Sequence, residues 1–84
     1  MKYTVYILFS ETYNRTYVGY SSDVLTRLSF HNSNKNKGWT RRFQPWTLIY
    51  TEEYDSKTEA LRREKQLKTG KGRELIKLLV KNKK

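Results

Sequence analysis

The sequence predicts a small α/β domain of the α+β type, and three observations carry this prediction. Alternating aromatic and β-branched residues predict three strands, at residues 3–9, 15–20 and 46–54. Apolar residues at helical spacing predict three helices, at residues 23–32, 56–69 and 72–80. The chain has 84 residues, which is the size of one domain. We therefore expect residues 1–84 to form a single domain with a small core.

The first two strands should form a hairpin. In Tyr3–Phe9 both faces are apolar or aromatic, with residues 3, 5, 7 and 9 on one face and residues 4, 6 and 8 on the other. This pattern predicts a strand covered on both sides. Polar residues 10–14 predict a turn, after which Arg15–Tyr20 returns antiparallel. Tyr6 and Tyr17 should then lie on neighbouring strands.

The third strand follows Pro45. Simple alternation places Trp46, Leu48 and Tyr50 on one face of this strand. Thr47 and Ile49 should lie on the opposite face.

Capping residues mark where the helices begin and end. Asp23 can cap the first helix, and Ser56 with Glu59 fits a capping box at the start of the second. The second helix should stop at Gly70. Residues 80–84 form the end of the chain, where Lys81–Lys84 is expected to be a frayed basic tail.

Charge is the strongest compositional signal. Eighteen Lys and Arg against eight Asp and Glu give a net charge of +10. Such a bias points first to nucleic acid and second to an anionic membrane, although a solvated basic surface would look the same. The chain has no cysteine, so disulfides and thiolate metal sites are excluded. The short apolar run at the N-terminus is neither a membrane span nor a signal peptide, so a soluble cytoplasmic protein without membrane contact is expected.

One carboxylate stands where an apolar residue is expected. Glu64 falls within the helical stripe formed by Ala60, Leu61 and Leu67. A carboxylate on such a face must be paired, hydrogen-bonded or bound to a metal. A structural ion pair with Lys68 or with Arg27 is one interpretation, and a ligand for a hard divalent cation is the other.

Two further side chains share a helix face. Arg27 and His31 are four residues apart, so both could contact an anion. Gly19, in a strand beside aromatic residues, suggests a backbone that a ligand can approach closely. The alternative is that His31 is a hydrogen-bonded structural residue and that Arg27 is a packing residue. A zinc site is excluded, because the chain has no second histidine and no cysteine.

In combination these residues resemble the GIY-YIG nuclease superfamily. Its two motifs match Val5-Tyr6-Ile7, with Val in place of Gly, and Tyr17-Val18-Gly19. Its helix arginine matches Arg27, with His31 one turn later, and its metal-binding glutamate matches Glu64. Pro45–Tyr50 followed by Glu52-Glu53 resembles the small stand-alone bacterial members, the YhbQ-like group related to the Slx1 and UvrC nuclease domains. The asparagine that some branches carry after the glutamate has no clear counterpart in residues 68–77.

The resemblance implies a three-stranded antiparallel sheet flanked by helices and a metal-dependent DNA endonuclease, acting in DNA repair or on structured DNA. Glu64 would hold Mg2+ (or Mn2+), and Arg27 would donate to the scissile phosphate. Tyr6 would orient or deprotonate the attacking water, supported by Tyr17 and His31. A phenol with its usual pKa of ~10 is a poor base, so nearby cations would have to lower the pKa of Tyr6.

The expected partner is DNA, gripped by residues outside the catalytic set. Gly19 would keep the sheet surface clear for the substrate backbone. The predicted phosphate contacts are basic: Lys35, Lys37, Arg41, Arg42, Arg63, Lys68, Lys71 and Arg73. A non-catalytic DNA- or RNA-binding module is the alternative function. A basic protein that docks on an acidic partner or membrane ranks last, and the need for a protein partner is left open.

Overall fold

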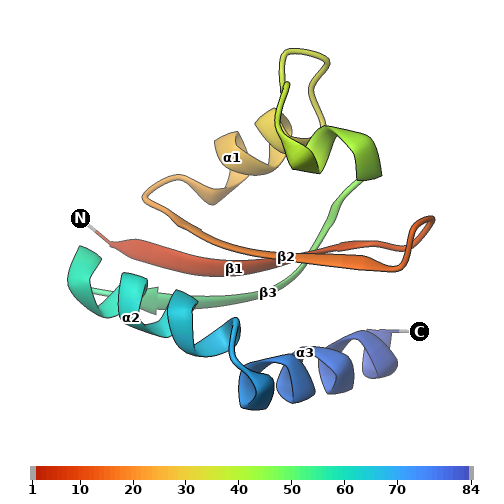
Figure 1. Cartoon of the computed structure of the whole chain (residues 1–84). Coiled ribbons are helices and arrows are strands. Elements are labelled where there is room, and N and C mark those ends of the chain that lie inside the picture. Colours follow the sequence, from red (N-terminus) through yellow and green to blue (C-terminus); the bar gives the residue numbers. More distant parts are fainter. Residues whose placement is uncertain (1, 84) are drawn as a thin grey trace.

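A computed structural model describes residues 2–83 as a three-stranded antiparallel sheet with helices on both faces (Figure 1). This confirms the predicted fold. The elements are, in chain order, β1 (Tyr3–Ser10), β2 (Arg15–Ser21), α1 (Val24–His31), the 3-10 helix η1 (Trp39–Phe43), β3 (Thr47–Tyr54), α2 (Lys57–Leu67) and α3 (Gly70–Lys83).

The sheet has the order β2-β1-β3, so β1 is the central strand. Figure 1 shows α1 and η1 on one face of the sheet and α2 and α3 on the other. Both faces of β1 are therefore covered, as its two apolar faces predicted. The register places Gly19 of β2 directly opposite Tyr6 of β1, and this pair positions the functional site.

The two faces of β1 build two separate hydrophobic clusters. Val5 and Ile7 pack with Ala60, Leu67 and Ile76 on the side of α2 and α3. On the other side the buried members of the cluster are Tyr6, Leu8 and Trp46, and partly buried residues such as Leu48 pack against them. The alternation predicted for β1 is thus confirmed.

The prediction for β3 was wrong at one residue. Trp46 and Leu48 do share a cluster with Tyr6, but Tyr50 packs against the opposite cluster, together with Ile49. The cause is an irregularity in the pairing: Ile7 pairs with Tyr50, whereas Leu8 pairs with Leu48. The extra residue on β3 reverses the alternation, so Tyr50, Glu52 and Tyr54 lie on the face covered by α2.

Both predicted helix caps are present. The Asp23 carboxylate accepts a hydrogen bond from the Thr26 amide at 3.1 Å. The Ser56 hydroxyl accepts one from the Glu59 amide at 3.2 Å. These caps fix where the chain leaves the sheet and enters α1 and α2, and hence where the side chains of both helices point.

The junction between α2 and α3 differs from the prediction. α2 ends at Leu67, and Gly70 begins α3 instead of closing α2. A Cβ on Gly72 would lie 2.4 Å from the Leu67 Cα and 2.4 Å from the Gln66 carbonyl oxygen. The glycine therefore allows the two helices to meet this closely.

The C-terminal segment also differs, because α3 continues to Lys83 where a frayed tail was expected. The expectation for Lys84 lies outside the described residues. Among residues 2–83, no helix has both the length and the apolar character needed to cross a bilayer.

Candidate active site

The side chains predicted to be catalytic converge from both sides of the sheet. A pocket of about 330 Å³ opens where β1, β2, α1 and α2 meet. It is lined by Tyr6, Tyr17, Gly19, Tyr20, Ser21, Arg27 and Glu64. We call it the catalytic pocket. His31 does not line it, but it contacts the pocket through Tyr6.

Tyr6 and His31 begin a chain of buried hydrogen bonds. The Tyr6 phenol oxygen lies 3.1 Å from His31 Nε2. On the other side of the ring, His31 Nδ1 lies 2.9 Å from Thr40 Oγ1. Asn36 Nδ2 donates to the same Thr40 oxygen at 2.6 Å. His31 is only 3% exposed, so its ring is held by these partners and not by solvent.

The loop that carries Thr40 is tied down from several directions. Trp46 Nε1 donates to the Thr40 carbonyl oxygen at 2.6 Å. Gln44 Nε2 donates to the carbonyl oxygens of His31 and Ser33, at 2.7 and 3.0 Å. The segment between α1 and β3 thus contains η1 and holds the imidazole in place.

Burial controls the protonation of this pair. Desolvation raises the pKa of Tyr6 above 10.0, and the nearby Tyr17 raises it further, while Arg27 acts in the opposite direction. The expectation that cations lower the pKa of Tyr6 does not hold in this structure. Desolvation, and secondarily Arg27, lower the pKa of His31 below 6.5. At neutral pH the site thus contains a neutral phenol beside a neutral imidazole.

Gly19 makes room for the phenol. A Cβ at this position would lie 2.6 Å from the Tyr6 hydroxyl oxygen and 3.0 Å from Tyr17 Cε2. Gly19 lines the pocket, as expected, but the neighbour it accommodates in the structure is the tyrosine side chain. The two tyrosine rings lie with their centroids 6.3 Å apart.

Arg27 reaches the pocket from α1. Its guanidinium carbon lies 5.5 Å from the centre of the Phe30 ring, within range for a cation–π contact. The residue is exposed, so its donors can reach a ligand in the pocket. A planar guanidinium is well suited to phosphate oxygens.

Glu64 lines the pocket from α2. It forms an ion pair with Lys68, which was one of the interpretations drawn from the sequence. Lys68 Nζ lies 3.1 Å from its carboxylate, and the Glu64 side chain is 16% exposed. The structural ion pair with Lys68 is therefore present. Glu64 nevertheless lines the same pocket as Tyr6 and Arg27.

The donor set suits only some metal ions. In residues 2–83 no group of three or more His, Asp or Glu side chains could hold a metal. Mg2+ commonly binds through one or two carboxylates and completes its shell with water and substrate phosphate oxygens. A single carboxylate facing an open pocket fits that kind of ion.

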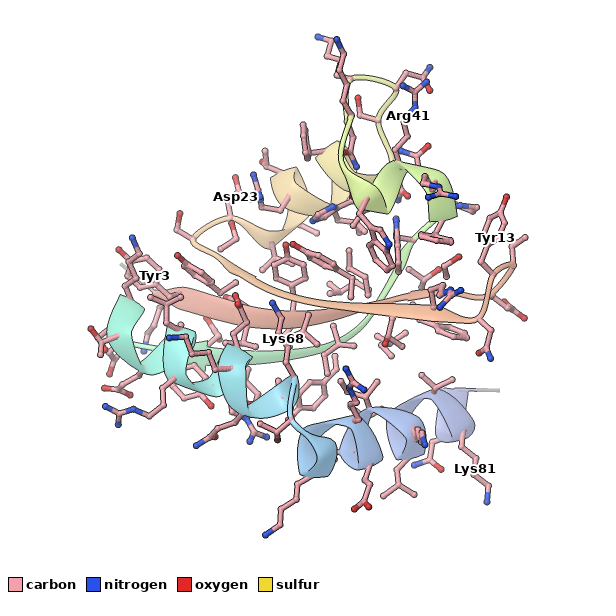
Figure 2. The ribbon with its side chains drawn as sticks, viewed as in Figure 1. Tyr3, Tyr13, Asp23, Arg41, Lys68 and Lys81 are labelled. Atoms are coloured by element: carbon pink, nitrogen blue, oxygen red, sulfur yellow. The ribbon has the colours of Figure 1, made fainter. Side chains whose placement is uncertain are left out.

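The residues predicted to contact DNA separate into three places. Four of them lie between α1 and β3 and are exposed: Lys35, Lys37, Arg41 and Arg42. Figure 2 shows Arg41 far from the sheet. Lys68, Lys71 and Arg73 are exposed around the junction of α2 and α3. Arg63 is not brought to the site, because it pairs with Glu52.

The pair formed by Arg63 and Glu52 belongs to a separate polar cluster. Arg63 Nε and Nη2 donate to the two Glu52 carboxylate oxygens at 2.9 and 3.1 Å. The hydroxyls of Tyr50 and Tyr54 donate to the same carboxylate. Although desolvation alone would raise it, these donors together lower the pKa of Glu52 from 4.5 to about 2.

Sequence reasoning missed Asn36 and Thr40. Both are nearly fully buried, and both belong to the hydrogen-bond chain behind His31. Their only signal in the sequence was that they are uncharged polar residues in a strongly basic loop. That signal does not indicate which partners they bind.

Known proteins are similar to this chain in sequence. The model of the GIY-YIG catalytic domain matches residues 2–77. A UPF0213 protein of Staphylococcus haemolyticus is 36% identical over 78 residues, which is 93% of this chain and 94% of that protein. A UPF0213 protein of Halobacterium salinarum is 46% identical over 52 residues, or 62% of this chain and 68% of that protein.

A solved structure is also similar. The solution NMR structure of a UPF0213 protein from Bacillus halodurans has a TM-score of 0.55 and 34% sequence identity. The match covers 94% of this chain and 85% of that one. The resemblance to small stand-alone proteins is thereby confirmed. The chain belongs to the family of the GIY-YIG catalytic domain.

Proposed function

We propose that the protein is a DNA endonuclease that hydrolyses phosphodiester bonds with the help of one divalent cation, Mg2+ or Mn2+. The observation that carries this proposal is the convergence of Tyr6, Tyr17, Arg27 and Glu64 in the catalytic pocket. Membership of the GIY-YIG family supports it. Cytoplasmic location and a role in DNA repair or the processing of structured DNA remain predictions.

Phosphodiester hydrolysis requires that negative charge on the phosphate be stabilised and that a proton leave the attacking water. Arg27 supplies donors for the non-bridging oxygens from α1. When bound at Glu64, the cation would neutralise charge on the scissile phosphate and help the leaving oxygen. Glu64 would then exchange its contact with Lys68 for the cation.

The hydrogen-bond chain offers a route for the proton. Since the phenol of Tyr6 is neutral, it cannot act as a base unless it first gives up its own proton. His31 Nε2 lies 3.1 Å from the phenol oxygen and can accept that proton. The phenol oxygen can at the same moment accept a proton from the attacking water. Thr40 on the opposite ring nitrogen holds the imidazole in the orientation that this transfer requires.

A non-catalytic DNA- or RNA-binding module is the second candidate, since the exposed basic residues would serve either function. A binding module has no need of a largely buried carboxylate in the same pocket as a phenol and a guanidinium. The location of Glu64 in the pocket therefore favours the enzyme.

Cleavage of a panel of labelled DNAs tests the proposal. Single strands, duplexes, flaps and four-way junctions would each be incubated with Mg2+, with Mn2+ and with EDTA. Glu64→Gln keeps the shape of the side chain and removes its charge. Glu74→Gln removes an exposed carboxylate on α3 and is the matched control.

Cutting should require the metal, disappear in Glu64→Gln and persist in Glu74→Gln. Binding without cutting on every substrate would support the binding module. Cutting that survives Glu64→Gln would contradict the assigned site.

A further inference from the structure

A larger groove follows the free edge of the sheet. Its volume is about 820 Å³, and it lies along β2, which is an outer strand. Side chains of α3 line it below the sheet, and Trp39 of η1 lines it on the other side. We call it the edge groove and define it by Arg15, Tyr17, Trp39, Lys68, Arg73 and Lys77.

The charge of the edge groove has one sign. Arg15 comes from β2, Lys68 follows α2, and Arg73 and Lys77 come from α3. Among the described residues, no Asp or Glu lines it. Figure 2 shows Lys68 beside the sheet near the α2–α3 junction. Cations from three separate elements facing one groove favour an extended polyanion.

Exposed aromatic rings continue the groove. Trp39 is 49% exposed, and its ring is stacked on that of Tyr17, with centroids 6.5 Å apart and planes at 29°. The ring centroids of Phe43 and Trp39 lie 4.7 Å apart. The guanidinium carbon of Arg15 lies 5.3 Å from the centroid of the Phe43 ring. Tyr13, labelled at the hairpin in Figure 2, is 50% exposed, and its ring centroid lies 5.5 Å from that of Phe43 in an edge-on contact.

Trp39 and Tyr13 both contact Phe43 and are both half exposed, so they form one apolar surface patch of the kind that marks an interaction site. Cations that alternate with exposed aromatic faces are typical of surfaces that bind single-stranded nucleic acid. In a duplex the base faces are stacked inside the helix, so they cannot reach Trp39.

The edge groove meets the catalytic pocket. Tyr17 lines both of them. Lys68 lines the edge groove, and its ammonium group contacts Glu64, which lines the catalytic pocket. A strand lying in the groove would therefore be led past Tyr17 to Arg27 and Glu64.

We propose that the edge groove binds single-stranded DNA, with its phosphates on Arg15, Arg73 and Lys77 and a base stacked on Trp39. The unpaired strand then enters the catalytic pocket beside Tyr17. This inference rests on the proposed DNA-cleaving function for its biological meaning, but binding can be measured without any cleavage.

Fluorescence anisotropy in EDTA tests the stacking contact. A labelled single strand and the duplex of the same sequence would be titrated at one salt concentration with wild type, Trp39→Ala and Trp39→Phe. Leu25→Ala is the control, because Leu25 is 72% exposed on α1 and does not line the groove. Thermal unfolding would establish that each variant is folded.

The wild type should bind the single strand more tightly than the duplex. Trp39→Ala removes the ring on which a base would stack, so its affinity for the single strand should be about fivefold to a hundredfold lower than that of the wild type. Trp39→Phe should lose less, and Leu25→Ala should change nothing. Equal affinity for strand and duplex, or unchanged single-strand affinity in folded Trp39→Ala, would overturn the proposal.

A charge-matched pair of variants tests the path without touching η1. The double variant Arg73→Gln, Lys77→Gln removes two cations from the groove. Arg62→Gln, Lys65→Gln removes two exposed cations from α2, outside the groove. The first should weaken single-strand binding more than the second, and equal losses would overturn the proposal.

An acidic polypeptide separates DNA recognition from simple attraction of anions. Polyglutamate of matched charge should displace the single strand poorly, because it has no bases to stack. Equal displacement would contradict the assignment. Since these titrations contain no metal, their failure would leave the cleavage result intact, and a failed cleavage test would leave them interpretable.

Discussion

The phenol oxygen of Tyr6 on β1 lies 3.1 Å from Nε2 of His31 on α1, and both residues are at most 3% exposed. This contact joins the sheet to the helix that also carries Arg27. The neutral forms of both groups are favoured by burial. The contact therefore gives His31 the structural role considered from sequence, and the proposed proton transfer would run through the same contact.

The position of the proton on His31 should depend on Thr40. Thr40→Val removes the oxygen that faces Nδ1 and accepts from Asn36. We expect cleavage to fall about tenfold or more, as for a misplaced acid–base group, and Thr40→Ser to restore most of it. Nitrogen NMR of the wild-type imidazole should show a protonated Nδ1 and an unprotonated Nε2. The opposite tautomer would contradict this route.

Gly19→Ala should damage the site more than the fold. The added Cβ would lie 2.6 Å from the Tyr6 hydroxyl oxygen, so the phenol must move away from His31. Cleavage should fall by at least tenfold, a loss typical of a displaced catalytic group. The melting temperature should change less than for Tyr6→Ala, which empties a buried site. Full activity in Gly19→Ala would show that the phenol can shift without consequence.

The ion pair of Glu52 with Arg63 should make stability depend on acid pH. The folded-state pKa of Glu52 is lowered from 4.5 to about 2, so its contribution is complete above pH 4.5 and is lost as the pH falls toward 2. That contribution is about 3 kcal/mol at most. In Glu52→Gln, the free energy of unfolding from urea titrations should vary less over this pH window. An unchanged pH profile would contradict the pairing.

Gly72→Ala should destabilise the protein without touching the catalytic pocket. Its Cβ would collide with backbone atoms of Gln66 and Leu67, which cannot rotate away. We expect a loss of about 1–3 kcal/mol, as for other overpacked sites. Gly70→Ala is the control, because nothing lies within 4 Å of a Cβ there. Equal melting temperatures for the two variants would contradict this contact.

DNA binding should weaken steeply with salt. If about six phosphates are neutralised by the exposed cations, the log–log slope of affinity against salt should be roughly −5. Arg42→Gln should make the slope about one unit shallower if that residue contacts a phosphate. The same change at Arg63 should have little effect, because Arg63 is paired with Glu52. A slope near zero would contradict the electrostatic account.

Local patterns were sufficient for most of the fold. The two apolar faces of Tyr3–Phe9 indicated a covered central strand, and Asp23 and Ser56 marked the starts of two helices. Each of these signals acts between residues close together in the chain. The resemblance carried by the two tyrosine motifs, Arg27 and Glu64 pointed to residues that line one pocket in the structure.

Contacts between distant residues could not be inferred in this way. The extra residue in β3 that turns Tyr50 toward α2 depends on the pairing of β1 with β3. The pairing of Arg63 with Glu52 depends on how α2 lies across the sheet. An isolated arginine looks the same in sequence whether it binds phosphate or a buried carboxylate.

The sequence by itself determined the three strands, the three α-helices, the net charge and the residues expected to be catalytic. Only the tertiary structure decided the protonation and the hydrogen-bond partners of these residues. Burial of Tyr6 raises the pKa of its phenol, whereas the role as a base implied by the resemblance had required a lowered pKa. Asn36 and Thr40 gained their role because η1 folds back over α1. Desolvation and hydrogen-bond partners are properties of the packed chain, so local sequence could not supply them.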